Sequence, residues 1–330
     1  MEQAPPLPGP EAHVWALTDG HAGNVRQALA LARALASDTT DVPVREVELH
    51  GRAPWRWSAP RCIPASERAF GPAFARLLRT PPMLAVGCGR QAALATRLLR
   101  KRGARAVQIL DPRLPARLWD WVVAPAHDGL SGAHIIQVQG SLNEIDDAWL
   151  AEARAAFPAL GALPGPRTAV LIGGPSAHLA FDVAALDALC AQLDALTAGG
   201  ALMITASRRT PVAVRERLRQ RYARQAAQLW IDEADGDNPY AGMLAWADRI
   251  VCTPDSVNML SEACATRAPV YVFEPQHLGG RPRVFVDALL ASGRVRSLAA
   301  DPAHLSDDFN LEPLRETARV ASILRERMGL

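Results

Sequence analysis

Apolar segments of strand length alternate with longer segments of helical pattern along most of the chain, and this alternation constrains the fold most. In the first half, strand-like segments lie at 13–18, 44–49, 83–87, 106–110, 121–124 and 135–138. In the second half, they lie at 168–173, 201–206, 228–231, 249–252 and 270–273. Because helical segments separate the strands, we expect parallel sheets covered by helices on both faces.

The alternation restarts after Pro158–Arg167, a stretch rich in proline and glycine that predicts a domain boundary. A chain of 330 residues is long for one domain and comfortable for two. We expect a disordered N-terminus at 1–12, Rossmann-like domains at 13–160 and 161–312, and a terminal helix at 313–330 that packs back on the first domain. The predicted fold class is α/β, with two doubly wound domains that face each other across a cleft.

Composition and charge exclude several classes of protein. The formal net charge is +2 and Lys101 is the only lysine, so no polybasic segment indicates a nucleic-acid partner. The five cysteines form no CxxC pair, which favours reduced, buried thiols over a metal site. The chain has no apolar signal-peptide core and no run of 18 apolar residues. We therefore expect a cytoplasmic protein without metal or cofactor, and peripheral contact with the inner membrane stays open.

The first candidate site is the turn at 19–23, between a strand-like segment and a helix. Its glycines, Gly20 and Gly23, let backbone amides approach a ligand, and the start of the helix favours an anion. Asp19 and His21 place a carboxylate and an imidazole in one turn, which suits a base and its partner. In the structural alternative, this is a tight turn in which Asp19 only accepts hydrogen bonds from backbone amides.

The helix after this turn is expected to begin at Asn24, as N-cap, with Gln27 at the N3 position. Further polar residues follow other strand-like segments of the first half: Gly87-Cys88-Gly89-Arg90, Asp111-Pro112-Arg113 and Ala126-His127-Asp128-Gly129. Of these, Arg90 would contact an anion, while Asp111, His127 and Asp128 would line the same side of the cleft. X-Pro and Asp-Gly pairs are also ordinary in turns, so a structural role is the alternative.

Glycines and arginines follow the first two strands of the second half: Gly173, Gly174, Ser207, Arg208 and Arg209. The glycines allow close approach of the backbone to a phosphate. The next residue, Thr210, is expected to cap a helix that begins with proline, which leaves the two arginines unexplained by capping. Because the planar guanidinium matches phosphate oxygens, two arginines at a strand end predict a diphosphate site.

A third polar group begins the helix after 249–252 and comprises Asp255, Ser256 and Glu262. In the structural alternative, Asp255 is a simple N-cap. Because its negative charge would repel a phosphate, we assign phosphate contact to Ser256 and the nearby amides. Glu262 lies two turns farther along the same helix face and could accept hydrogen bonds from two ribose hydroxyls. A helix start with a serine and a glutamate in this arrangement is typical of nucleotide-sugar sites.

Several stretches between about residues 13 and 275 resemble the ELM-type mitochondrial fission family, in the form of its bacterial members: WALTDGHAGNVRQAL, VGCGRQAALA, VQILDPRLP, VVAPAHDGL, VLIGGPSAH, ITASRRTP, NPYAGMLAWAD and VCTPDSVNMLSEA. That family is similar in fold to the GT-B superfamily, which includes the lipid II N-acetylglucosaminyl transferase. The resemblance implies that the second lobe holds a nucleotide-sugar donor and the first lobe holds the acceptor. One departure is Thr266-Arg267-Ala268, where the family is expected to have Thr-Gly-Lys.

The resemblance assigns roles to residues of both lobes. The implied donor contacts are Gly173, Gly174, Ser207, Arg208, Asp255, Ser256 and Glu262. The implied acceptor side is Asp19, Gly20, His21 and Gly23. The first lobe would thus contain the base, and the second would bind the leaving diphosphate.

Together, residues and resemblance predict a metal-independent glycosyltransferase that uses a nucleotide-diphosphate sugar, in cell-envelope glycan or lipid synthesis. Asp19 or His21 would deprotonate the acceptor hydroxyl, and Arg208 with Arg209 would stabilise the leaving diphosphate. One alternative is a non-catalytic scaffold of the mitochondrial fission type, and another is a nucleotide-sugar epimerase. Because a scaffold needs no charged residues in its cleft, the retained charges favour an enzyme.

Overall fold

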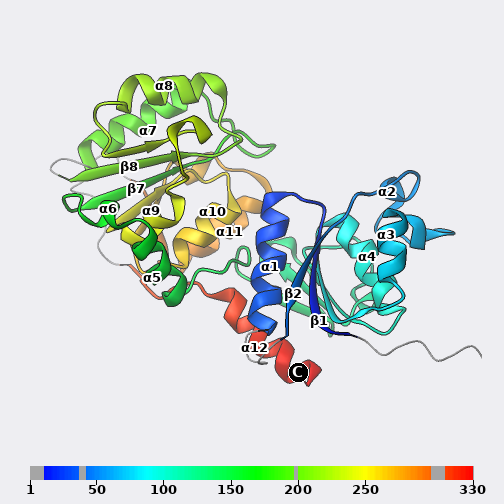
Figure 1. Ribbon diagram of the computed structural model, residues 1–330. Coiled ribbons are helices and arrows are strands. Elements are labelled where there is room, and N and C mark those ends of the chain that lie inside the picture. Colours follow the sequence, from blue (N-terminus) through cyan, green and yellow to red (C-terminus); the bar gives the residue numbers. More distant parts are fainter. Residues whose placement is uncertain (1–10, 37–41, 197–199, 299–308, 330) are drawn as a thin grey trace, which may run out of the picture. The chain divides into compact units, whose positions relative to one another are not determined.

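The structure is a computed structural model that describes residues 11–36, 42–196, 200–298 and 309–329 (Figure 1). It divides into two compact units, Met1–Glu144 with Glu316–Leu330, and Ile145–Arg315. Each unit contains a six-stranded sheet in which all pairings between strands are parallel. The predicted α/β class with two doubly wound sheets is therefore confirmed.

The sheet of the first unit has the order β2-β1-β3-β4-β5-β6. Its strands are β1 (Glu11–Thr18), β2 (Val44–Glu48), β3 (Pro82–Cys88), β4 (Arg105–Ile109), β5 (Trp121–Pro125) and β6 (Ile135–Val138). The chain adds β2 on one side of β1 and then crosses to β3 on the other side. The point where the strand order reverses therefore lies between β1 and β3, and ligands of such sheets bind at this switch point.

Helices cover both faces of this sheet. They are α1 (Ala22–Ala36), α2 (Trp55–Ser58), α3 (Gly71–Leu77), α4 (Arg90–Arg100) and α12 (Glu316–Met328), with 3-10 turns at Ser66–Arg68, Ala116–Leu118 and Ala126–Asp128. Val14 and Ala16 of β1 pack in one core with α1 and α12, while Trp15 and Leu17 pack in another core with α3 and α4. Burial of both faces explains why β1 is apolar without alternation.

The sheet of the second unit has the order β12-β11-β10-β7-β8-β9. Its strands are β7 (Arg167–Ile172), β8 (Ala201–Ala206), β9 (Gln228–Trp230), β10 (Arg249–Cys252), β11 (Val270–Val272) and β12 (Val295–Ser297). The order reverses between β7 and β10, which places the switch point of this unit at their carboxyl ends. Strand β12 was missed by the sequence pattern, because arginine and serine follow its single apolar residue, Val295.

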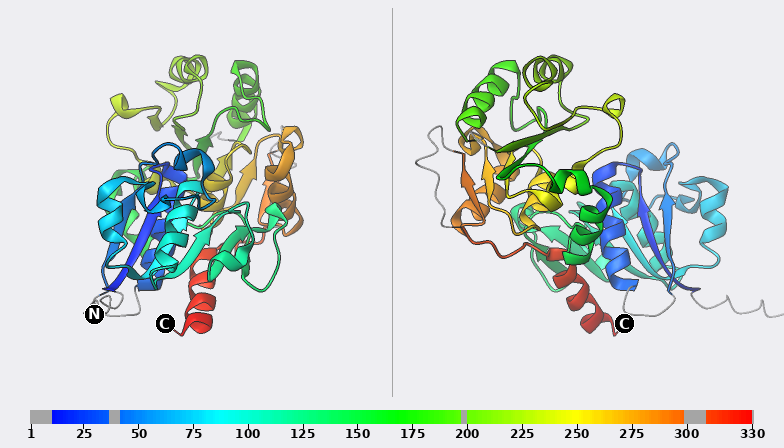
Figure 2. Two further views of the ribbon diagram at one scale, coloured as in Figure 1. Left: turned by 90° about the vertical axis from the view of Figure 1, so that its right-hand side faces the viewer. Right: turned by 60° about the vertical axis from the view of Figure 1, so that its left-hand side comes forward.

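The helices of the second unit also lie on both faces of their sheet, with α7 and α8 on one side (Figures 1 and 2). They are α5 (Asp147–Ala156), α6 (Pro158–Gly161), α7 (Val183–Leu196), α8 (Val212–Tyr222), α9 (Tyr240–Trp246), α10 (Val257–Cys264) and α11 (Gly280–Ala291), with 3-10 turns at Glu233–Asp235 and Pro275–His277. In the described part of the chain, no helix is long and apolar enough to cross a membrane.

The division between the units lies at 144/145, whereas the sequence placed it at 160/161. The difference arises because α5 packs on α9: Leu150 shares a core with Met243, and Arg154 Nε donates to the Ala245 carbonyl at 2.9 Å. At the other end, α12 shares the core of α1 and belongs to the first unit. Of the N-terminus predicted to be disordered, residues 1–10 lie outside the described residues, and Glu11 begins β1.

Candidate functional site

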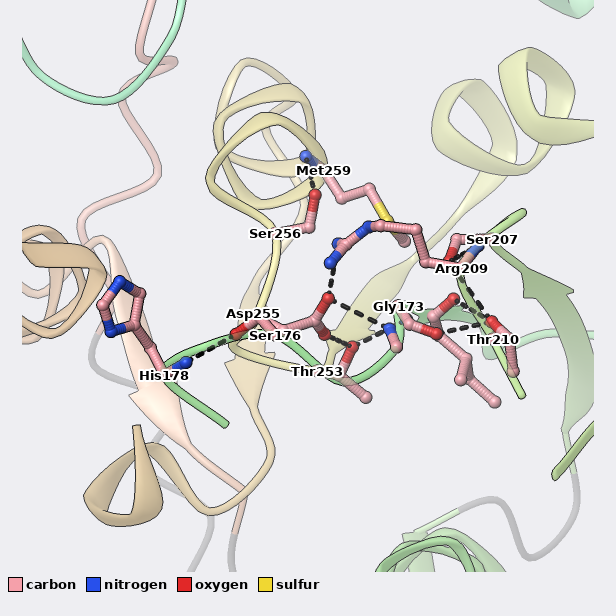
Figure 3. Close-up of polar contacts among 12 residues, drawn as sticks. Gly173, Ser176, His178, Ser207, Arg209, Thr210, Thr253, Asp255, Ser256 and Met259 are labelled. Atoms are coloured by element: carbon pink, nitrogen blue, oxygen red, sulfur yellow. Dashed lines mark hydrogen bonds and ion pairs between the residues drawn. The ribbon is translucent and has the colours of Figure 1, made fainter. Parts of the chain in front are cut away.

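Hydrogen bonds join the ends of β7 and β10 at the switch point of the second unit (Figure 3). The Gly173 amide donates to Thr253 Oγ1 at 2.8 Å, and the Gly174 amide donates to Asp255 Oδ2 at 3.0 Å. Thr253 Oγ1 in turn donates to Asp255 Oδ1 at 2.6 Å. A Cβ at Gly173 would lie 2.1 Å from Asp255 Oδ2, so only glycine fits here. The structure thus brings three predicted site residues together and adds Thr253.

Arg209 completes this cluster from the end of β8. Its Nη2 lies 2.6 Å from Asp255 Oδ2, and the carboxylate has no solvent exposure, whereas the arginine side chain is 48% exposed. Asp255 is therefore not the N-cap that the sequence indicated. A buried carboxylate requires a partner charge and hydrogen-bond donors, and Arg209, Thr253 and the Gly174 amide supply them.

The two arginines, which looked equivalent in the sequence, have different surroundings. Arg208 is exposed, and its guanidinium makes no hydrogen bond or ion pair with another residue that the structure describes. Its carbonyl oxygen accepts a hydrogen bond from Arg215 Nη2 at 3.0 Å, which fixes the backbone of the turn. The whole guanidinium of Arg208 is therefore available to an anion. Arg209 has only those N–H groups available that do not contact Asp255.

Ser207 and Thr210 hold this turn against β7 rather than capping a helix. Ser207 Oγ accepts from the Arg209 amide at 3.2 Å and lies 3.2 Å from Thr210 Oγ1. The Thr210 hydroxyl donates to the Gly173 carbonyl. The predicted Thr210 cap is wrong because α8 begins two residues later, at Val212, without a side-chain cap.

Ser256 is the N-cap of α10, where its Oγ accepts from the Met259 amide at 3.4 Å. Glu262 lies farther along α10 and is only 5% exposed. Its Oε2 accepts from the Tyr240 hydroxyl at 2.5 Å, so a phenol at the start of α9 orients this carboxylate. The sequence reasoning missed Tyr240 as a site residue. The only available signal was its place in the stretch NPYAGM.

The switch point of the first unit joins the turn after β1 to the end of β3. Asp19 Oδ1 accepts from Asn24 Nδ2 at 2.9 Å and lies 3.1 Å from His21 Nδ1. Asn24 Oδ1 accepts from the buried Cys88 thiol at 3.5 Å. Burial raises the pKa of Asp19, but the hydrogen bonds from Asn24 and His21 outweigh it and leave the pKa below its ordinary value. Asp19 is therefore an ionised carboxylate beside an imidazole that is 79% exposed.

Asn24 does not cap α1, contrary to the sequence prediction. The helix begins at Ala22, and the amides of Asn24 and Val25 donate to the His21 carbonyl at 2.8 and 2.9 Å. The capping box with Gln27 is also absent, since Gln27 Nε2 donates to the Gly23 carbonyl at 3.3 Å. The Asn24 side chain is thereby left to bind Asp19.

The remaining predicted residues of the first unit contact other groups. Arg90 Nη2 donates to the Arg56 carbonyl at 3.2 Å. Asp111 closes its own turn, because its carboxylate accepts from the Arg113 amide at 2.7 Å and lies 3.0 Å from Arg113 Nε. His127 and Asp128 form a 3-10 turn after β5. These residues follow β3, β4 and β5 in turn, progressively farther from the switch point.

The arrangement can hold an anion in the second unit and accept a proton in the first. In the second unit, Arg208 and Arg209 lie at the end of β8, beside the switch point. Ser256 Oγ and the first amides of α10 lie at its edge. Among the described residues, no group of three or more His, Cys, Asp and Glu side chains is arranged to hold a metal ion.

The sequence matches the family described as Mitochondrial fission ELM1 over residues 22–328. It is 30% identical over 276 residues to the mitochondrial fission protein ELM1 of Arabidopsis thaliana, an alignment that covers 75% of this chain and 64% of the plant protein. The chain thus spans slightly less than two thirds of the length of that relative.

Two solved structures are similar over nearly the whole chain. MurG of Acinetobacter baumannii has a TM-score of 0.50 at 14% identity, over 95% of this chain and 99% of that protein. The UDP-GlcNAc 2-epimerase of Methanocaldococcus jannaschii, in complex with UDP-GlcNAc and UDP, has a TM-score of 0.53 with the same identity and coverage. The GT-B-like fold predicted from the sequence is therefore confirmed.

Proposed function

The chain belongs to the Mitochondrial fission ELM1 family, and on that premise we propose that it is a metal-independent glycosyltransferase whose donor is a nucleotide-diphosphate sugar. The observation that carries this proposal is the pair of arginines beside the switch point of the second unit, one exposed and one held by a buried carboxylate. Ligands of doubly wound sheets bind at this place, and arginine forks match the oxygens of a diphosphate. The complex of the similar epimerase with UDP-GlcNAc and UDP supports the class of donor.

In the proposed donor site, the diphosphate lies between the arginines and the start of α10. Arg208 binds it with its free guanidinium, and Arg209 binds it with the N–H groups that Asp255 leaves open. Ser256 and the amides of α10 add hydrogen bonds. Glu262, oriented by Tyr240, accepts from the ribose hydroxyls. Two guanidinium charges stabilise the leaving diphosphate, so this step requires no metal.

In the proposed acceptor site, His21 is the base and Asp19 orients it. His21 Nδ1 donates to Asp19, which leaves Nε2 as the ring atom that can take a proton. The acceptor hydroxyl gives its proton to Nε2 while its oxygen forms a bond to the anomeric carbon. The bond between that carbon and the diphosphate breaks, and the diphosphate leaves with the electron pair. The carboxylate of Asp19 stabilises the imidazolium that results.

Titration calorimetry with UDP and other nucleoside diphosphates tests the donor site. We expect Arg208→Ala to weaken binding by at least ~1.5 kcal/mol, the lower range for a hydrogen bond to a charged group. Arg217→Ala is the matched control, because that arginine lies on α8 and pairs with Asp187 at the surface. Equal affinities of the wild type and Arg208→Ala would remove Arg208 from the site. Absence of binding by any nucleoside diphosphate would refute the donor class and favour the scaffold alternative.

Epimerisation of the donor is the second candidate function. It is favoured by the similarity to the UDP-GlcNAc 2-epimerase, whose TM-score slightly exceeds that of MurG. The two reactions differ in what they consume, because an epimerase converts the nucleotide sugar without an acceptor. Proton NMR of UDP-GlcNAc with the protein alone separates them. We expect no epimer, and formation of one would replace the transferase proposal.

A further inference from the structure

We propose that Asn24 is a positioning residue of the first unit. The Cys88 thiol holds Asn24 in place, and Asn24 in turn fixes Asp19. Asp19 then keeps the ring proton of His21 on Nδ1, which leaves Nε2 as the base. This inference rests on the proposed function, in which His21 takes the proton of the acceptor. It gives roles to Asn24 and Cys88, which the sequence motifs contained but to which they assigned no part in catalysis.

The geometry joins three elements of the first unit in one chain of contacts. Cys88, at the end of β3, donates to Asn24 Oδ1 at 3.5 Å. Asn24, in the first turn of α1, donates through Nδ2 to Asp19 Oδ1 at 2.9 Å. Asp19, after β1, contacts His21 Nδ1 at 3.1 Å. The room for this chain depends on Gly89, where a Cβ would lie 2.6 Å from Asn24 Nδ2.

Donor and acceptor roles fix the direction of the chain. A carboxylate accepts hydrogen bonds and never donates, so the Asn24 amide must direct its NH₂ group at Asp19. The amide oxygen then faces Cys88, whose S–H is the donor that suits it. Because burial raises the pKa of the Cys88 thiol, it keeps the proton that it donates. A reversed amide would place oxygen against carboxylate, so Asp19 selects the orientation, and the Cys88 S–H supplies the donor for the amide oxygen that then faces it.

The same roles determine the tautomer of His21. The backbone amide of His21 donates to Asp19 Oδ1 at 3.4 Å, whereas the ring can donate to this oxygen only if Nδ1 carries a proton. In the neutral ring, the lone pair then lies on Nε2. Two further ionisable side chains near this turn, Glu48 and His50, come from the end of β2. Glu48 is the nearest side chain to Gly20, and His50 Nδ1 lies 4.0 Å from Glu48 Oε1. Both are largely exposed, which leaves Asp19 as the carboxylate that binds the imidazole.

Nitrogen-15 NMR of the full chain with labelled histidines tests the inference without any nucleotide. In the wild type, we expect the His21 signals to show the Nδ1–H tautomer. In Asn24→Ala, we expect the Nδ1–H tautomer of His21 to be no longer the predominant form, because Asp19 is no longer held beside the ring. An unchanged tautomer ratio in a folded Asn24→Ala protein, or an Nε2–H tautomer in the wild type, would overturn the proposal.

Variants of Cys88 provide a second measurement, in case Asn24→Ala does not fold. Cys88→Ser keeps a donor and should retain the Nδ1–H tautomer, whereas Cys88→Ala should lose part of it. Cys190→Ala, which removes a buried thiol from α7 in the other unit, is the control and should change nothing at His21. Equal spectra for Cys88→Ala and Cys88→Ser would refute the role of the thiol. Failure of the proposed function appears separately, as absence of nucleotide binding by the wild type.

Discussion

Replacement of Arg209 by alanine tests whether the buried Asp255 carboxylate depends on its partner. Removal of one member of a fully buried ion pair costs about 3–5 kcal/mol, whereas an exposed pair contributes about 0–1 kcal/mol. Here the carboxylate has no exposure and the guanidinium is 48% exposed, so this pair lies between the two cases. Asp255 also keeps its hydrogen bonds from the Gly174 amide and Thr253 Oγ1. We therefore expect Arg209→Ala to lower the free energy of unfolding by ~1.5–3 kcal/mol.

Urea unfolding and calorimetric melting measure this loss, which corresponds to a decrease of about 3–12 °C in the melting temperature of the second unit. Arg217→Ala is the control and should cost at most ~1 kcal/mol, because both partners of its ion pair are exposed. In the double variant Arg209→Ala/Asp255→Asn, the buried charge is gone. Its loss of unfolding free energy should therefore be smaller than the sum of the losses of the two single variants, by at least ~0.5 kcal/mol. If Arg209→Ala were no more destabilising than Arg217→Ala, or if the losses were additive, the reasoning would be refuted.

Three further results are expected. The pKa of Asp19 in the folded protein is below its ordinary value, so its carboxylate stabilises the fold at pH values above the ordinary pKa. This stabilisation is lost as the pH falls through the folded pKa. The difference in unfolding free energy between wild type and Asp19→Asn, measured by urea unfolding, should therefore shrink between pH 7 and pH 3. Tyr240→Phe should weaken calorimetric binding of UDP more than that of 2′,3′-dideoxy-UDP, because the Tyr240 hydroxyl orients Glu262, which contacts the ribose in the proposed site. Equal losses would separate Tyr240 from sugar recognition. Gly173→Ala should destabilise the protein by about 1–3 kcal/mol in thermal melting, since its methyl group would overlap the buried carboxylate of Asp255. An unchanged melting temperature would show that Asp255 can move away from position 173.

The architecture could be predicted because strand and helix patterns are local and repeat along the chain. The segment at 13–18 is apolar without alternation, which indicates burial on both faces, and β1 is buried in this way. Strand order is not local, however. The position of each switch point therefore became known only from the pairing of β1 with β3 and of β7 with β10.

The errors at the candidate site have one physical cause. Asn24, Thr210 and Asp255 all stand at or near the start of a helix, where each residue type is a good N-cap. In the structure, each side chain instead contacts a neighbouring strand end or turn: Asp255, for example, binds the amide of Gly174, 81 positions away. A local pattern cannot distinguish these outcomes, because the strand-end partners Cys88, Gly173 and Gly174 are distant in sequence. The same limit hid Tyr240, whose role depends on Glu262 in the next helix.

The contrast between Arg208 and Arg209 indicates how the proposed donor site is organised. The inner residues, Gly174, Thr253 and Asp255, are buried and bind one another, so they shape the strand ends and are not free to contact a ligand. Their effect on a ligand passes through Arg209, whose guanidinium is held before any diphosphate arrives. An arginine fixed in this way loses less side-chain entropy on binding than a free one, whereas Arg208 keeps its full charge but must become ordered. In the proposed site, motif residues that look like direct contacts in the sequence therefore divide into two groups. Some would bind the ligand, and the others position the residues that would bind it.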